Sequence, residues 1–568
     1  MRARAKLWIG LGAILAAALG LRMWAGDGVV FTRGDARAVE AATSASWRDA
    51  VVLSVMDGRG VLTPLILRAC ARALGAADAA LMAPGILLGI AACALLYAFE
   101  RDAGRRGDAL LTVGLGAFSS CWISASLRAG PIAFYPVLAT GLLFTGMRVL
   151  RGESSWKWAH FACALLLAAG GPTGWLLALV LPVAARMTFP RTEARVCREL
   201  ERSTGWALLA GAPILLLRVA VFAMVGPSSE GGVADARLIR EGFGDVIGNL
   251  APLVVALAIV AWLHGVVRIY RRGRLSGITW ETLLQIALPR DRLLAACWAG
   301  VSVALAAGGS WIFQEWKFGD PVGVSPALFL LLSAAIAWGW KAGKGWEQRA
   351  ARLALMLGAA GTVGMSVAGI RERVASGNAK LAVTAISDRL RPGDVVAVLS
   401  WTGASEIRRQ LPEGVRLVAM PWGDAGDPRQ WAGVAEAMRQ PMGLDLFLKA
   451  IVRQARPEGR VWVFDAWKGT LGGYLIQRDV EFLDVRAQPF YGSAWRYFDD
   501  EESARFDPAV VSREMMYLEA WRGVELDHRL RALWPRRSVR LAENDPARSA
   551  YEGSRFVVTE FAVPREIQ

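Results

Sequence analysis

Residues 79–126 read AALMAPGILLGIAACALLYA (79–98), FERDAGRRGD (99–108) and ALLTVGLGAFSSCWISAS (109–126). Two apolar runs thus lie on either side of a short loop that is rich in arginine. Each run has the length that a helix needs to cross the roughly 30 Å hydrocarbon core of a bilayer, at about 1.5 Å per residue. This pattern predicts two membrane-spanning helices, and it decides the fold class because the chain repeats it.

Apolar blocks of this kind recur over the first two thirds of the chain. Hydrophobic residues make up 54% of the 568 residues, and they are gathered in blocks instead of being spread through the sequence. Hydropathy predicts about eleven spans, near residues 7–24, 79–98, 109–126, 131–149, 159–171, 173–187, 206–225, 250–267, 293–313, 326–340 and 353–370. We therefore expect an α-helical polytopic membrane protein with a transmembrane domain over residues 1–370, and a soluble enzyme is excluded.

The orientation of the spans follows from the cations between them. Lysines and arginines gather in alternate loops, marked by Arg105, Arg148, Arg195, Arg271 and Lys341. The positive-inside rule makes these loops cytoplasmic. The run 7–24 is long for a signal peptide and has no small-x-small site after it, so we expect a retained first helix with its N-terminus in the cytoplasm. An odd number of spans then places residues 371–568 outside the cytoplasm.

The remaining composition excludes several classes of function. The net charge of +15 comes from arginines that alternate with spans, so nucleic acid is not expected as a partner. The six cysteines and three histidines show no metal or redox spacing. No Walker A, dinucleotide-binding, nucleophile-elbow or zinc-protease motif occurs. Ionisable residues are nearly absent from the spans, which counts against an ion-coupled transporter.

A long outer loop, residues 25–78, follows the first span. A helix is expected over residues 35–46. A second helix is predicted by Thr63 as its N-cap, Pro64 at its first position and Gly75 just past its end.

Two arginines lie on this second helix. Arg68 and Arg72 are four residues apart, so they share a polar stripe opposite the apolar residues. Such a helix could lie along the membrane interface with its arginines near phosphate groups. An ordinary packed connector fits the same pattern equally well.

Residues 371–568 have a different character, because no apolar run there is long enough to span a membrane. Short β-like runs appear at Val395–Leu399, Arg416–Ala419 and Val461–Phe464, with helical patterns between them near 403–411 and 443–456. We expect an extracytoplasmic α/β domain with a small, largely parallel sheet. Asp465, at the end of the third run, is a candidate for ligand binding, because ligands of α/β sheets bind at the ends of strands.

Residues on the outer side carry a family resemblance. Gly34-Asp35 opens the first outer loop, Thr63-Pro64-Leu65 opens the second helix, Ala83-Pro84 begins the second span, and Arg128 closes the third. This arrangement resembles the GT-C class of membrane glycosyltransferases, and it is similar to bacterial relatives of protein O-mannosyltransferases and aminoarabinose transferases (family 39-like). The resemblance is at the level of patterns and covers about residues 7–190.

The sequence departs from the family pattern at several places. Ala36, not Glu, follows Asp35, and Thr63-Pro64 replaces a His-Pro-Pro element. Met82 stands where the family usually has Arg, and Tyr135 lies too far along to match the usual tyrosine.

The resemblance implies an inverting transfer of sugar from a polyprenyl-phosphate donor at the outer leaflet of a bacterial inner membrane. Asp35 would be the general base, with Glu40 orienting it or the acceptor. Arg128 would bind the donor phosphate, with Arg68 and Arg72 behind it. The acceptor would be a polysaccharide, lipid or protein of the envelope. No cofactor is expected, although some related enzymes use a divalent metal.

Each of these residues also has an ordinary structural interpretation. Asp35 could cap a helix, Glu40 could lie on a solvated helix face, and Arg128 could be an interfacial anchor. The alternative functions are a ligase or polymerase of envelope polysaccharide and a non-catalytic assembly factor. A transporter ranks last.

Overall fold

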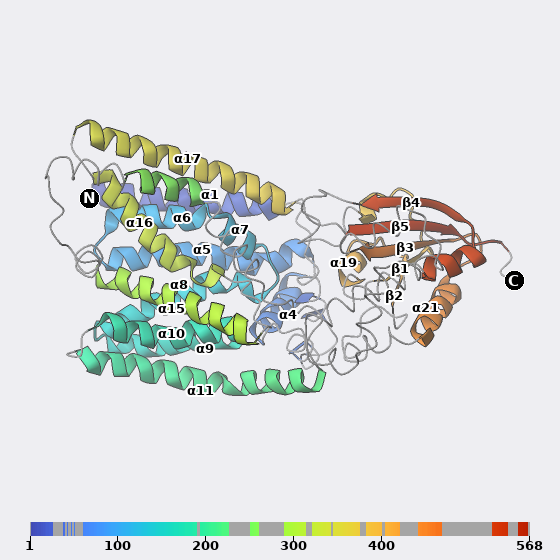
Figure 1. Cartoon of the computed structure of the whole chain (residues 1–568), viewed down its shortest axis with the longest axis horizontal. Helices are drawn as coiled ribbons and strands as arrows, with labels where there is room; N and C mark the ends of the chain where they lie inside the picture. The colour runs from blue at the N-terminus through green and yellow to red at the C-terminus, as the bar shows by residue number, and fades with distance from the viewer. Residues whose placement is uncertain are drawn as a thin grey trace. The chain divides into compact units, whose positions relative to one another are not determined.

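The computed structural model (Figure 1) describes residues 2–26, 38–39, 42–43, 47, 50–51, 61–75, 77–189, 193–225, 250–260, 289–313, 321–341, 345–374, 382–399, 404–420, 441–467, 525–542 and 555–565. The chain divides into two compact units. One holds residues 1–28, 58–220 and 234–374, and the other holds residues 29–57, 221–233 and 375–568.

The first unit is a bundle of helices. Its members are α1 (Arg2–Gly26), α4 (Leu62–Leu74), α5 (Asp78–Asp102), α6 (Arg106–Ala117), α7 (Ser120–Ser126), α8 (Tyr135–Leu150), α9 (Lys157–Gly170), α10 (Pro172–Thr188), α11 (Ala194–Val225), α15 (Arg290–Phe313), α16 (Ser325–Lys341) and α17 (Trp346–Val374). Residues 251–260 are also helical. Three short 3₁₀ helices are η1 (Pro131–Ala133), η2 (Ser154–Trp156) and η5 (Pro321–Gly323). A helix overlaps every one of the apolar windows that the sequence predicts.

The helices differ in how well they suit a membrane. Within the described residues, α1, α5 and α17 contain segments long and apolar enough to cross one, and α6 with α7 forms a fourth candidate that is bent by 57°. The apolar helices α8, α10, α16 and 251–260 are shorter. The count of eleven spans stays a prediction.

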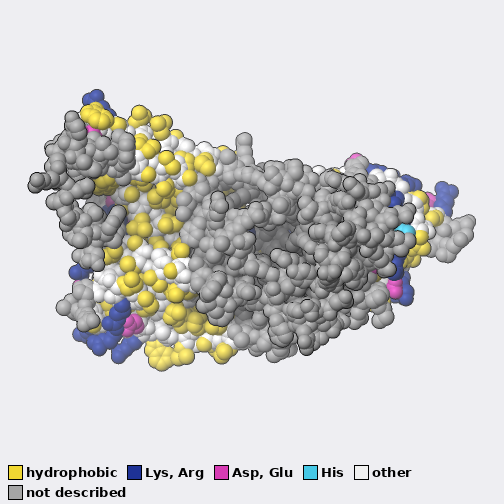
Figure 2. Space-filling view, in the orientation of Figure 1, with side chains coloured by type: hydrophobic (Ala, Val, Ile, Leu, Met, Phe, Trp, Pro, Cys, Tyr) yellow, Lys and Arg dark blue, Asp and Glu magenta, His cyan; other side chains and the backbone are white. Residues whose placement is uncertain are grey.

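The surface of the bundle is apolar between its ends. Figure 2 shows a band of hydrophobic side chains over the helices, with lysines and arginines gathered beyond one end of the band. Large apolar side chains point outward, among them Leu87 at 65% and Trp158 at 77% exposure. Soluble proteins rarely expose apolar patches of this extent. The band and the apolar helices together indicate a multi-pass membrane protein.

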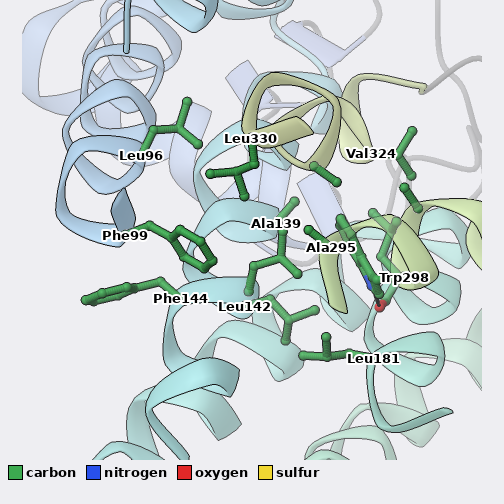
Figure 3. Packing of buried hydrophobic residues seen from close by; sticks show 14 of the residues in the cluster. Leu96, Phe99, Ala139, Leu142, Phe144, Leu181, Ala295, Trp298, Val324 and Leu330 are labelled. Atoms are coloured by element: carbon green, nitrogen blue, oxygen red, sulfur yellow. Dashed lines mark hydrogen bonds between the residues drawn. The ribbon is translucent and has the colours of Figure 1, made fainter. Parts of the chain in front are cut away.

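The interior of the bundle is packed with apolar side chains from most of its helices. Figure 3 shows Leu96 and Phe99 of α5 near Leu142 and Phe144 of α8, with Leu181, Trp298 and Leu330 completing the cluster. The buried Trp298 indole donates a hydrogen bond to the Leu177 carbonyl at 2.8 Å, which satisfies its only polar atom. This core fixes α5, α8, α10, α15 and α16 relative to one another.

A charged cluster is buried where α5 ends and α6 begins. Glu100, fully buried, accepts from Arg105 Nε at 2.5 Å and from Arg292 Nη2 at 3.1 Å. Arg292 also pairs with Asp108 at 2.9 Å, and Arg105 pairs with Asp291. The five side chains tie α5, α6 and α15 together at this end of the bundle, which we call the Glu100 end.

The second unit is built on a five-stranded sheet in the order β2-β1-β3-β5-β4. Its strands are β1 (Val395–Val398), β2 (Arg416–Ala419), β3 (Arg460–Trp467), β4 (Arg536–Ala542) and β5 (Arg555–Ala562). Strand β1 pairs in parallel with β2 and β3, whereas β5 pairs antiparallel with both β3 and β4. Helices α19 (Ala404–Arg408), α21 (Pro441–Gln454) and 525–533 accompany the sheet, and apolar clusters form on both of its faces.

The sequence predicts β1, β2 and β3 at these residues, but two of its expectations for the sheet are wrong. The sheet is mixed rather than largely parallel, because β4 and β5 join it from the end of the chain. Strand β3 also continues past Phe464, since residues up to Trp467 pair with β5. Asp465 therefore lies within a paired strand, opposite Val557, and not at a strand end.

Candidate functional site

The helix ends opposite the Glu100 end meet around α4, and we call this the α4 end. The Val61 amide donates to the Ala169 carbonyl at 3.2 Å, which joins the start of α4 to the end of α9. The Tyr135 hydroxyl at the start of α8 lies 3.4 Å from the Gly170 carbonyl. These contacts bring together the ends of α4, α8 and α9.

Two glycines of α5 let other helices approach closely at this end. A Cβ on Gly85 would lie 2.4 Å from the backbone oxygen of Ser126. A Cβ on Gly89 would lie 3.0 Å from the Ser126 Cβ and 3.1 Å from Arg22 Nε. The spacing Gly-x-x-x-Gly places both residues on one helix face, a common device for close helix packing in membranes. A larger side chain at either position would push α7 away from α5.

The third predicted span is broken. Helix α6 ends at Ala117, and α7, only seven residues long, begins at Ser120 after a 57° bend. Arg22 of α1, fully buried, lies against this break. It donates to the Ala117 carbonyl at 3.2 Å and to the Ser126 hydroxyl at 3.1 Å. A break inside a span leaves carbonyl groups without helical partners, and Arg22 satisfies one of them.

The opposite side of α7 is also held in place. The Trp122 indole donates to the Ser325 hydroxyl at 2.6 Å, and Ser325 donates in turn to the Val322 carbonyl at 2.5 Å. The Trp122 ring packs edge-on against Phe329, with 5.1 Å between centroids. Contacts with α1, α5 and α16 thus hold the seven-residue helix α7 in place.

Arg128 follows α7 after one intervening residue. Its amide donates to the Ala125 carbonyl at 3.2 Å, so its backbone completes the last turn. Its side chain is half-buried between the buried residues Leu127 and Ala129. Among the residues that the structure describes, no acceptor or carboxylate pairs with its guanidinium. A half-buried, unpaired arginine retains its full capacity to bind an anion.

The predictions for α4 are corrected in part. The helix begins at Leu62 with Val61 as N-cap, so Thr63 is inside it and makes no capping bond. Gly75 ends it with φ of +91°, as predicted. Arg68 is buried at 4% exposure together with Leu67, whereas Arg72 is exposed. The two arginines therefore do not share a solvent-facing stripe, because the first half of α4 packs against the bundle and the second half does not.

Asp35 and Glu40 lie outside the described residues, so their predicted roles stay predictions. Near them, residues 38–39 and 42–43 are helical, and the Thr43 hydroxyl donates to the Val39 carbonyl at 2.9 Å. Val39 and Ala42 are fully buried.

The charge at the α4 end is mainly positive. The described side chains of α1, α4, α5 and the loop after α7 place four arginines there, namely Arg22, Arg68, Arg72 and Arg128, and one carboxylate, Asp78. Within the described ranges, no three His, Cys, Asp or Glu side chains gather as metal ligands would. The chemistry available from these residues is the binding of an anionic group.

Arg22 is the residue of this end that the sequence predictions passed over. It lies inside the apolar window 7–24, which hydropathy reads as a uniform span. The sequence does contain a signal for Arg22, because a charged residue within a membrane span usually makes a structural or functional contact. It is an exception to the expectation that the spans carry almost no ionisable residues.

Comparison with known proteins gives a fold. No protein-family model and no curated sequence matches the chain. The crystal structure of ArnT from Cupriavidus metallidurans in the apo state is similar over 84% of this chain and 95% of its own, with 15% identity and a TM-score of 0.56. ArnT bound to undecaprenyl phosphate is similar over 83% and 95%, with 14% identity and a TM-score of 0.54.

A weaker likeness is to the archaeal oligosaccharyltransferase AglB from Archaeoglobus fulgidus, over 81% of this chain and 69% of that chain, with 9% identity and a TM-score of 0.46. The ArnT likeness covers most of both chains. It confirms the predicted GT-C fold.

Proposed function

We propose that this chain, which has the GT-C fold, is a membrane glycosyltransferase. It moves a sugar from a polyprenyl-phosphate donor to an envelope polysaccharide, lipid or protein acceptor on the extracytoplasmic side. Asp35 is the general base in this proposal, Glu40 orients the acceptor, and Arg128 binds the donor phosphate.

The observation that carries the proposal is the environment of Arg128. A half-buried guanidinium without a carboxylate partner in the described chain suits a phosphate, which arginine binds with two parallel hydrogen bonds. The excess of arginine at the α4 end favours the same anion. The ArnT structure with 14% identity was determined with undecaprenyl phosphate, an anion of this class. Arg72, which is exposed, is the second candidate for this contact, and the buried Arg68 would support the site from within.

The proposed chemistry needs only a base and a stabilised leaving group. Asp35 takes the proton from an acceptor hydroxyl while that oxygen attacks the anomeric carbon. The bond between the anomeric carbon and the phosphate oxygen breaks, and the polyprenyl phosphate leaves with the electron pair. Attack from the face opposite the phosphate inverts the anomeric configuration. The cation of Arg128 stabilises the negative charge that develops on the leaving phosphate.

The test compares native protein with Asp35→Asn at equal expression in membranes supplied with polyprenyl-phosphate sugars. Loss of a general base lowers turnover by about a hundredfold or more. Asp388→Asn is the matched control, because Asp388 is an exposed carboxylate of the second unit. Equal turnover by native and Asp35→Asn protein would show that another group is the base. No turnover by native protein with any donor would favour the non-catalytic assembly factor.

A further inference from the structure

Arg22 is a buried cation that donates hydrogen bonds to both parts of the broken span. Its side chain has no exposed surface. Its donors reach three acceptors in three helices: the Ala18 carbonyl at 3.1 Å, the Ala117 carbonyl at 3.2 Å and the Ser126 hydroxyl at 3.1 Å. Within the described part of the chain no carboxylate contacts it, and its Nη2 atom has no hydrogen-bond partner. A charge in an apolar interior is costly, so an arginine kept there indicates a role beyond filling space.

Two of the three acceptors lie on either side of the bend, and the third, Ala18, lies in α1 itself. Ala117 is the last residue of α6, and Ser126 is the last residue of α7. One guanidinium therefore joins the last residue of α6 to the last residue of α7 and links both to α1. The Ser126 hydroxyl donates onward to the Ile123 carbonyl at 2.7 Å, within α7 itself. The position of α7 thus depends directly on Arg22.

We infer that Arg22 is a positioning residue that holds α7, and with it Arg128, at the place where the donor phosphate binds. The inference rests on the proposed function in giving Arg128 that phosphate. Arg22 acts through Ser126, and the last turn of α7 leads directly to Arg128, whose amide bonds back to Ala125. Arg22 itself, being fully buried, does not contact substrate.

Gly89 of α5 leaves the space in which Arg22 contacts Ser126. A Cβ on Gly89 would lie 3.1 Å from Arg22 Nε and 3.0 Å from the Ser126 Cβ, tighter than ordinary contacts. Replacement of Gly89 by alanine therefore pushes apart the two groups that Arg22 joins. Gly114 of α6 offers a matched control, because nothing lies within 4 Å of a Cβ built there.

The geometry also explains why the residue is arginine. The planar guanidinium presents five donors in a fixed fork, whereas a lysine ammonium is a single point charge. Lysine at position 22 would keep the charge but would lose the two separate nitrogens, Nε and Nη1, that bind Ser126 and Ala117. Arg22→Lys therefore separates the positioning role from the charge.

The test measures turnover and the location of residue 128 in parallel. In full-length protein, Arg22→Lys, Ser126→Ala and Gly89→Ala should raise KM for a polyprenyl-phosphate sugar about tenfold, because a misplaced arginine loses a charge-assisted hydrogen bond to the donor. kcat should fall as well, because the same contact stabilises the negative charge that develops on the leaving phosphate in the transition state. Gly114→Ala should behave as native protein.

The second readout does not depend on activity. Arg128→Cys is labelled with an anionic maleimide with and without Arg22→Lys, beside Leu74→Cys, which replaces an exposed residue of α4. We expect the labelling rate at 128 to shift while the rate at 74 does not.

The two readouts separate the inference from the proposed function. Unchanged KM and unchanged labelling at 128 in Arg22→Lys would overturn the inference. An equal change in labelling at 74 and 128 would also overturn it, because it would mean that Arg22 only stabilises the bundle. If native protein shows no turnover, the proposed function fails, and the labelling rates alone decide whether Arg22 positions residue 128.

Discussion

Arg22 and Arg128 are both arginines near the outer ends of predicted spans, yet their surroundings differ. Arg22 has no exposed surface and donates to two carbonyl groups and a hydroxyl. Arg128 is half-buried and, within the described residues, pairs with nothing. Sequence reasoning found Arg128 from its place in a family-like pattern, but it passed over Arg22, because hydropathy averages one charge away within an apolar window. Burial and hydrogen bonding at a single residue depend on its neighbours in space, which one sequence does not reveal.

Replacement of Arg128 tests its proposed role directly. Arg128→Gln should raise KM for the polyprenyl-phosphate sugar about ten- to a hundredfold, because the phosphate loses a charge-assisted contact. Steady-state transfer kinetics in membranes measure this. Arg349→Gln, an exposed arginine of α17 near the Glu100 end, is the control and should leave KM unchanged. Equal KM values for the two variants would remove Arg128 from the phosphate site.

Gly85 should be the glycine of α5 least tolerant of replacement. Its added Cβ would lie 2.4 Å from the Ser126 backbone oxygen, and backbone cannot rotate aside. Gly85→Ala should lower stability by about 1–3 kcal/mol, the usual cost of overpacking. Thermal unfolding of the purified protein in detergent measures it. Gly12→Ala, with nothing within 4 Å of its Cβ, should be close to native, and a Gly85→Ala protein as stable as this control would contradict the close α5–α7 contact.

At the scale of elements, the sequence predicts where helices lie better than how they break or pack. All eleven windows overlap helices, since a run of about 20 apolar residues is a strong local signal. The bend between α6 and α7 is not predicted, because the run 109–126 is apolar throughout and the bend depends on contacts with α1, α5 and α16. Arg68 and Arg72 show the same limit, since helical spacing puts them on one stripe but only part of α4 is packed.

The sheet shows the same distinction between local and distant information. Strands β1, β2 and β3 are short apolar runs that are legible in the sequence. Strands β4 and β5 are not, because their place in the sheet depends on pairing of β5 with β3 across a long stretch of chain. Antiparallel addition of such strands cannot be inferred from a local pattern.

The buried charged cluster at the Glu100 end predicts how strongly ion pairs between α5, α6 and α15 contribute to stability. Glu100→Gln removes the carboxylate that Arg105 and Arg292 share, while each arginine keeps a second carboxylate, Asp291 or Asp108. Loss of a buried hydrogen bond between charged groups costs about 1.5–3 kcal/mol, and thermal unfolding in detergent should show this loss. Glu199→Gln, which breaks the partly exposed pair with Lys157, should cost less than about 1 kcal/mol. Similar losses for both variants would mean that the cluster does not hold α5 to α15.

At the scale of the whole molecule, the fold class follows from the sequence, and likeness to ArnT over most of both chains confirms it. The topology of the chain in the membrane stays a prediction of the positive-inside rule. It states that the α4 end and the second unit are extracytoplasmic and that the Glu100 end is cytoplasmic.

Cysteine labelling in intact spheroplasts tests this topology. An impermeant maleimide should react with Ser387→Cys, an exposed position of the second unit, in intact spheroplasts. It should react with Trp346→Cys, an exposed position at the start of α17, only after the spheroplasts are permeabilised. Burial raises the pKa of the native Cys70 thiol, which limits its background reaction because the thiolate is the reactive form. The opposite labelling pattern would place the second unit in the cytoplasm and reverse the predicted orientation.

The most direct measurement follows a labelled sugar from its lipid carrier. Purified native protein is given a polyprenyl-phosphate sugar or the matching nucleotide sugar, together with envelope acceptor, and both the labelled product and the released polyprenyl phosphate are quantified. We predict that label leaves the lipid in step with the appearance of polyprenyl phosphate, and that the nucleotide sugar gives no product. Label that remains on the lipid, or transfer from the nucleotide sugar alone, would contradict the assignment of a lipid-linked donor.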